Sequence, residues 1–197
     1  MENFFEKELK KRCDNTPYHD LYLQWQTTKN SIPEFLSLII NVFPHFTLHD
    51  SSHSENILSN IKKFLPENSI LQLTTTDIWM LLFAAYFHDI GMYVSKDDYK
   101  ETIESKAFLE FIKDVQEDSN NPLWKYANFF KIINNELKYK AESISMESVY
   151  SLKYLIAGFL RNKHAERSKD IIKNNSFIYL PASIPSRIVD LLAEICQ

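Results

Sequence analysis

Glycine is the residue that this sequence lacks most clearly. Only Gly91 and Gly158 occur in 197 residues, whereas average usage is about 7%. This scarcity excludes glycine-rich phosphate loops, since neither a GxGxxG motif nor a Walker-type loop can be written. Cysteine is equally scarce. Cys13 and Cys196 lie at opposite ends of the chain, so the sequence has neither a disulfide framework nor a CxxC motif.

Long apolar runs and a surplus of positive charge are also missing. The longest apolar run, residues 78–87, is far shorter than the ~20 residues of a membrane helix. The charged N-terminus does not resemble a signal peptide. We therefore predict a cytoplasmic protein without a membrane partner. The net charge of −4 argues against a general nucleic-acid binder, so long nucleic acid is not an expected partner.

The apolar residues that are present recur at spacings of three and four, which predicts an all-α fold. A chain of 197 residues favours one domain or two small ones. The expected helices cover residues 2–13, 18–27, 33–43, 53–65, 77–90, 101–118, 122–138, 146–173 and 185–197.

The doublet His88-Asp89 carries the strongest chemical signal. It closes a helix, residues 77–87, that is apolar on every side and must therefore run through the core. Gly91 is expected to end this helix. An imidazole and a carboxylate at the end of a buried helix are costly unless they are paired or bind a metal. A capping aspartate beside a hydrogen-bonded histidine is the alternative interpretation.

His53 lies on the same helical stripe as Ile57 and Ile61, and we expect it to face the core. Ser52 and Glu55 predict a capping box at the start of this helix. A satisfied core histidine is the usual meaning of such a position. However, His49 lies four residues upstream, and a His-x3-His spacing can bring two imidazoles to one ion.

His164 and Arg167 share a second stripe with apolar neighbours, and Arg161 lies one turn earlier. Guanidinium groups beside a metal site suit phosphate oxygens, which accept bidentate hydrogen bonds. The alternative is a solvated basic helix end that is stabilised by the helix dipole.

Two segments, residues 53–57 (HSENI) and 87–91 (FHDIG), resemble the HD-domain superfamily of metal-dependent phosphohydrolases. That family has a helical core whose metal is held by one histidine, a His-Asp doublet and a later aspartate. The resemblance implies an all-α, single helical-bundle HD-type domain in which His53, His88 and Asp89 hold a divalent metal ion.

Two further segments, residues 46–50 (FTLHD) and 161–168 (RNKHAERS), resemble a subgroup in which an HD domain precedes a histidine-kinase-like ATPase region. This implies a downstream ATPase domain as a partner. The resemblance covers residues 45–197. We therefore predict an HD-type metal-binding domain there, and an added N-terminal helical prefix at residues 1–44.

The resemblance also implies roles for other side chains. Mixed nitrogen and oxygen ligands suit Mn, Fe, Ni, Co or Zn, and the carboxylate also admits Mg. Such an ion lowers the pKa of its water toward neutrality and supplies a hydroxide nucleophile. His49 and His164 are candidates for a second ion or for contact with the leaving group. Arg161, Lys163 and Arg167 are candidates for phosphate binding.

The family's last aspartate is expected on a helix after the doublet. Asp170 and Asp190 are in range, and Asp190 is the candidate fourth ligand. Residues 186–197 form a helical pattern without a glycine, a proline or a basic last turn. We therefore expect the chain to be cut inside a helix, which would place the fourth ligand beyond Gln197.

The leading prediction is a metal-dependent phosphohydrolase that acts on a nucleotide or a similar small phosphate ester. The first alternative is a catalytically silent HD-fold module that senses a ligand or docks a partner. The second is a plain helical scaffold whose histidines are core residues.

Overall fold

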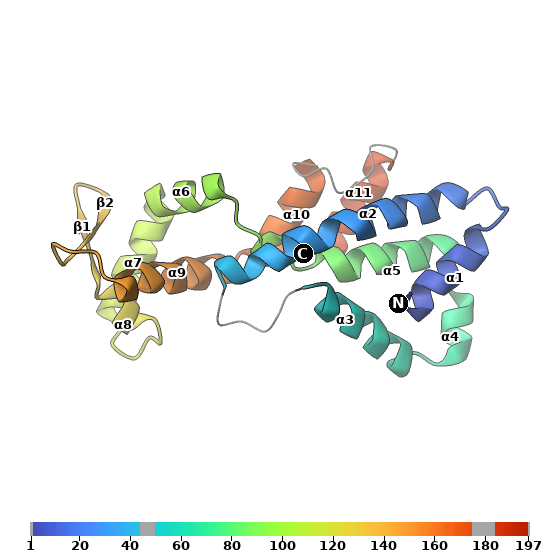
Figure 1. The fold of residues 1–197 in the computed structure, drawn as a ribbon, viewed down its shortest axis with the longest axis horizontal. Helices are drawn as coiled ribbons and strands as arrows, with labels where there is room; N and C mark the ends of the chain where they lie inside the picture. Colours follow the sequence, from blue (N-terminus) through green and yellow to red (C-terminus); the bar gives the residue numbers. More distant parts are fainter. Residues whose placement is uncertain (1, 44–49, 175–183, 197) are drawn as a thin grey trace. The chain divides into compact units, whose positions relative to one another are not determined.

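The computed structural model describes residues 2–43, 50–174 and 184–196, which are mostly helical (Figure 1). The predicted all-α fold is therefore confirmed. The chain divides into two compact units. Unit 1 comprises Met1–Ile40, Phe46–Tyr93 and His164–Gln197, and unit 2 comprises Asn41–His45 and Val94–Lys163. None of the described helices is by itself long and apolar enough to cross a membrane.

Unit 1 contains both the N-terminal helices and the doublet. Its helices are α1 (Phe4–Cys13), α2 (His19–Leu38), α3 (Ser51–Phe64), α4 (Glu67–Gln72), α5 (Thr75–Phe87), α10 (His164–Asn174) and α11 (Ser186–Ile195). The 3₁₀ turn η2 (Ile90–Met92) follows α5, and η1 (Ile39–Asn41) follows α2.

Helix α5 is the centre of unit 1. It packs against α1, α2, α3 and α11, and Figure 1 shows it running between α2 and α3. A capping box between Thr74 and Asp77 begins the helix. On its buried side, the Trp25 ring of α2 lies edge-on to Phe83 and Tyr86, with ring centroids 5.6 and 5.1 Å apart. The uniformly apolar sequence of α5 is thus explained by burial on several sides.

The N-terminal helices differ from the sequence-based expectation. Residues 18–27 and 33–43 were expected to form two helices, but α2 continues as one helix through Pro33. Proline forgoes one backbone hydrogen bond, and the buried side chains of Ile32 and Leu36 on either side hold the helix against the core. The predicted boundary after residue 44 stays a prediction.

A partly buried polar network ties four helices of unit 1 together. The Glu6 carboxylate of α1 is 1% exposed, pairs with the Lys29 ammonium of α2 and accepts a hydrogen bond from Trp25 Nε1 at 3.1 Å. Lys29 Nζ also lies 3.5 Å from Glu55 Oε1 of α3. The same oxygen accepts a hydrogen bond from the Tyr86 hydroxyl of α5 at 2.7 Å. One cation therefore serves two carboxylates at the junction of α1, α2, α3 and α5.

Unit 2 combines helices with one β-hairpin. Its elements are α6 (Lys96–Glu104), α7 (Lys106–Glu117), α8 (Trp124–Ala127), β1 (Phe130–Ile133), β2 (Glu136–Tyr139) and α9 (Met146–Arg161). Helices α7 and α9 pack together, and the Phe108 and Phe159 rings meet edge-on with centroids 5.3 Å apart.

The hairpin replaces a helix that was expected over residues 122–138, so that prediction is wrong. Strands β1 and β2 pair antiparallel, with Ile133 opposite Glu136. The two residues between them, Asn134 and Asn135, have φ angles of 52° and 59°. Asparagine tolerates this left-handed conformation, which a two-residue type I′ turn requires at both positions. The helix expected over residues 146–173 also divides, because α9 ends at Arg161 and α10 begins at His164.

Replacing Lys29 tests whether the polar network stabilises the fold. Lys29→Met leaves the buried Glu6 carboxylate without its ammonium partner, and we expect the free energy of unfolding to fall by about 3 kcal/mol. The matched control is Lys106→Met, which removes an exposed 3.5 Å pair with Glu110 and should change stability by less than about 0.5 kcal/mol. Urea unfolding measures both variants. Equal losses would contradict a special role for Lys29.

Candidate metal centre

The first turn of α3 places His53. Asp50 is the N-cap of this helix, and its carboxylate accepts hydrogen bonds from the backbone N–H groups of Ser52 at 2.9 Å and His53 at 3.4 Å. The expected capping box between Ser52 and Glu55 is therefore wrong, because the N-cap is Asp50 and the helix begins two residues earlier than expected. The Ser52 hydroxyl and these N–H groups hold the pKa of Asp50 below its ordinary value. They also anchor the helix end that carries His53.

The end of α5 places the doublet. His88 is the C-cap of α5, and Asp89 leads into η2. His88 Nδ1 lies 3.1 Å from the Ala85 carbonyl oxygen. A carbonyl only accepts hydrogen bonds, so Nδ1 carries the hydrogen and Nε2 is the atom that can bind a metal. The Asp89 side chain is buried, with 6% of the residue exposed.

His53, His88 and Asp89 converge on one point. His88 Nε2 lies 2.9 Å and His53 Nε2 lies 3.4 Å from Asp89 Oδ2. The two imidazole centroids are 5.3 Å apart, and one ligand atom from each residue lies within 4.8 Å of the others. Two imidazoles and a buried carboxylate are donors that divalent transition metals accept. The residues present therefore fit a divalent cation.

The cluster also controls protonation of His88. Burial by itself disfavours the imidazolium, but the hydrogen bond and charge of Asp89, together with the Ala85 carbonyl, outweigh it and raise the pKa of His88 above its ordinary value. A cation that binds Nε2 has to displace this proton. Cation binding should therefore weaken as the pH falls through the raised pKa of His88.

The other predicted ligands that the structure describes are not part of this group. His49 lies outside the described residues. His164 is the first residue of α10, is partly buried and is not one of the three clustered ligands. Asp190 is exposed on α11, with Oδ1 3.5 Å from Lys173 Nζ, and Asp170 is exposed on α10. Roles for these residues stay predictions.

The three basic residues that were predicted to bind phosphate lie in different units. Arg161 and Lys163 belong to unit 2, where Arg161 ends α9 and Lys163 Nζ lies 4.2 Å from the centroid of the Phe159 ring. Arg167 belongs to unit 1 and contacts the backbone after the doublet. Phosphate binding by these residues stays a prediction.

Gly91 has a different role from the one expected. Helix α5 ends at Phe87, and Gly91 has no positive φ, so it does not act as a left-handed helix cap. Instead it lets α10 approach. A Cβ at this position would lie 2.0 Å from the His164 carbonyl oxygen and 2.5 Å from the Ser168 backbone nitrogen. The sequence analysis gave Ser168 no role of its own, although Ser168 ends the segment 161–168 and one of the two glycines follows the doublet.

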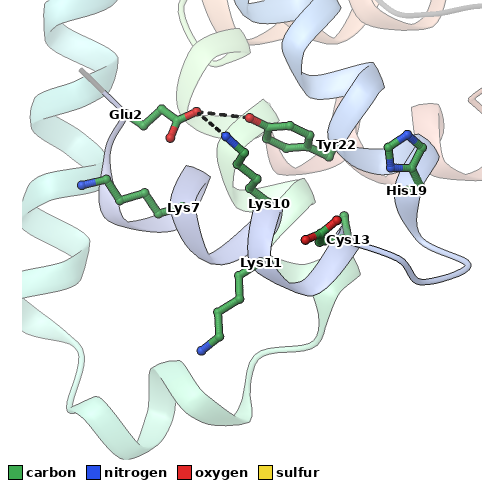
Figure 2. Close-up of a pocket in the computed structure, with 8 residues that line it drawn as sticks. Glu2, Lys7, Lys10, Lys11, Cys13, His19 and Tyr22 are labelled. Atoms are coloured by element: carbon green, nitrogen blue, oxygen red, sulfur yellow. Dashed lines mark hydrogen bonds and ion pairs between the residues drawn. The ribbon is translucent and has the colours of Figure 1, made fainter.

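A pocket elsewhere in unit 1 holds none of the clustered ligands (Figure 2). Its lining includes Glu2, Tyr22 and three lysines of α1. The Glu2 carboxylate accepts a hydrogen bond from the Tyr22 hydroxyl at 3.2 Å and lies 3.8 Å from Lys10 Nζ. Figure 2 shows Lys7 and Lys11 extending away from Glu2. The cations therefore do not converge as an anion site requires.

The fold and the cluster together define a helical protein with a His-His-Asp candidate metal centre. A model of the HD-CE family matches residues 43–197, well over half of the chain. The chain therefore belongs to the HD-CE family, an HD-type family. No curated protein matches the chain, and neither does any solved structure. The narrower resemblance to HD domains that precede an ATPase region stays a prediction.

Substitution of the two glycines tests whether α10 packs closely against the backbone at Gly91. Gly91→Ala forces backbone atoms apart, and we expect a loss of about 3 kcal/mol or more in the free energy of unfolding. Gly158→Ala meets only the end of a side chain, Leu123 Cδ1 at 2.4 Å, and gains helix propensity, so stability should change by less than about 1 kcal/mol. Thermal unfolding compares them. Similar behaviour of the two variants would contradict the close approach.

Replacing Asp50 tests the helix end that carries His53. Asp50→Ala should lower the free energy of unfolding by about 1 kcal/mol, whereas Asp50→Asn retains a capping oxygen and should lose little. The folded-state pKa of Asp50 is lowered. The advantage of the parent over Asp50→Asn should therefore be complete above the unfolded pKa and be lost as the pH falls through the folded pKa. Urea unfolding between neutral and acidic pH measures this, and a pH-independent difference would contradict it.

Proposed function

We propose that this protein is a metal-dependent phosphohydrolase that acts on a nucleotide or a similar small phosphate ester. The observation that supports this best is the convergence of His53, His88 and Asp89 from the ends of two helices. Membership of the HD-CE family supports it further.

Each clustered residue has a part in this proposal. When bound, a divalent cation supplies an acidified water as nucleophile and polarises the phosphoryl oxygen. Asp89 contributes the negative charge that holds the cation and accepts a hydrogen bond that orients the attacking water. The Ala85 carbonyl fixes the tautomer of His88, so that Nε2 is directed at the cation. His53, anchored by the capped end of α3, completes the set.

The proposed roles of the remaining candidates come from the sequence pattern. Arg161 and Lys163 would neutralise charge on the phosphate as it builds in the transition state. His164 and His49 would contact the leaving group or a second cation.

A catalytically silent HD-fold module that senses a ligand or docks a partner is the second candidate function. The observation in its favour is the number of ligands. Among the residues that the structure describes, three donors form the cluster. The candidate fourth ligand, Asp190, pairs with Lys173 at 3.5 Å. Three protein donors can retain a cation. In this second candidate function, a site that lacks the fourth ligand binds the cation without hydrolysing substrate.

Metal content measured by elemental mass spectrometry tests the centre directly. The parent should contain a near-stoichiometric divalent metal after purification or after soaking with Mn²⁺. Asp89→Ala should lose it, because loss of a ligand exceeds the ~10–100-fold loss in affinity that an outer-shell change costs. The matched control is His19→Ala, since His19 is exposed on α2 and should leave metal content unchanged.

Hydrolysis separates the two candidate functions. The metal-loaded parent should hydrolyse bis-p-nitrophenyl phosphate or a member of a nucleotide panel, and His88→Ala should abolish this with folding intact. Metal uptake without hydrolysis of any ester would favour the silent module. No metal in the parent, even after soaking, would overturn the proposal.

A further inference from the structure

Side chains of α10 form hydrogen bonds with the backbone on either side of Asp89. Ser168 is fully buried, at 0% exposure. Its hydroxyl donates to the His88 carbonyl at 2.8 Å and accepts from the Gly91 N–H at 2.9 Å. These two bonds lie on either side of Asp89 in the sequence. A hydroxyl has one donor hydrogen, so this pair of contacts defines its orientation.

Arg167, one residue earlier on α10, holds the next part of the same backbone. Its Nε donates to the Gly91 carbonyl and its Nη2 to the Tyr93 carbonyl, each at 2.9 Å. The planar guanidinium presents these N–H groups at a fixed separation, which a lysine ammonium cannot reproduce. Arg167 therefore sets the spacing between two carbonyls of the turn that follows Asp89.

Gly91 makes both sets of contacts possible. With a Cβ at Gly91, the Ser168 backbone nitrogen and hydroxyl oxygen would lie 2.5 and 2.8 Å away. Such distances are too short for real atoms, so α10 would have to move outward and lengthen the hydrogen bonds. Gly91, Ser168 and Arg167 thus form one set of contacts between α10 and the turn, which we call the α10 clamp.

The clamp acts on Asp89 through the backbone of the turn to which this residue belongs. Asp89 is the N-cap residue of η2 but makes no side-chain capping hydrogen bond. Its carboxylate projects from the backbone between His88 and Gly91, and Ser168 bridges this backbone on both sides.

We propose that Ser168 and Arg167 are positioning residues of the metal centre, which act by fixing the backbone that presents Asp89. The inference rests on the proposed function, because it assumes that a cation binds at His53, His88 and Asp89. It gives Arg167 a role other than direct phosphate binding.

Titration with Co²⁺ tests the clamp, because the visible spectrum of bound Co²⁺ reports ligand geometry. Ser168→Ala and Arg167→Lys should each weaken Co²⁺ affinity by about 10–100-fold, as for outer-shell partners of other metal sites, and should alter the spectrum. Arg167→Lys keeps the positive charge, so a loss of Co²⁺ affinity in this variant is due to loss of the paired guanidinium hydrogen bonds to the Gly91 and Tyr93 carbonyls. If Ser168→Ala fails to fold, Arg167→Lys still decides the question.

Two controls separate positioning from stability. Ser151→Ala removes another buried hydroxyl, which donates to the Glu147 carbonyl within α9. Arg187→Gln removes an exposed arginine of α11. Both should leave Co²⁺ affinity and spectrum unchanged, whatever their melting temperatures. If the clamp variants lose stability but bind Co²⁺ with the affinity and spectrum of the parent, the clamp is only structural and the proposal is overturned.

The outcomes also separate this inference from the proposed function. A parent that binds Co²⁺ but hydrolyses no phosphate ester would overturn the hydrolase alone, and the clamp variants would still show their loss of affinity. A parent that binds no Co²⁺ would overturn both. Hydrogen exchange of the Gly91 amide in metal-free protein adds a direct check. It should be slow in the parent and faster in Ser168→Ala, and equal rates would contradict the clamp.

Discussion

A buried carboxylate at the end of an apolar helix is the constraint around which unit 1 is arranged. Asp89 is 6% exposed, and removing such a charge from water costs several kcal/mol unless partners compensate it. The Nε2 atoms of His53 and His88 lie 3.4 and 2.9 Å from its Oδ2 atom. A divalent cation bound there would compensate the charge more fully.

The site is built almost entirely from helix ends. Side chains at helix ends can meet at a point, because the chain there is free of the regular helical spacing. Asp50 caps the end of α3 that carries His53, and Ser168 holds the turn after α5. Glu55 and Tyr86 join the same two helices through a 2.7 Å hydrogen bond. The network that includes Lys29 therefore holds together the two helices that carry the clustered residues.

Features with a local cause could be predicted from the sequence. The apolar run of α5 identified a core helix, and the doublet after it identified His88 and Asp89, because burial of polar groups is readable from their neighbours. Features that depend on distant residues could not. The hydroxyl of Ser168 bonds to residues 77 and 80 positions away, and nothing around Ser168 indicates this. The hairpin was missed because its signal, Asn134-Asn135, was outweighed by helical spacing in the flanking residues.

The route of the chain has a consequence for how the centre assembles. The chain leaves unit 1 at Tyr93 and returns at His164, so the larger segment of unit 2, Val94–Lys163, lies between the doublet and α10 in the sequence. Closing a flexible loop of 80 residues costs about 4 kcal/mol in chain entropy. Folding of unit 2, in which its first helix α6 packs against its last helix α9, removes much of that freedom in advance. Folding of residues 94–163 before α10 docks would therefore lower the entropy cost of bringing Ser168 to the backbone beside Asp89.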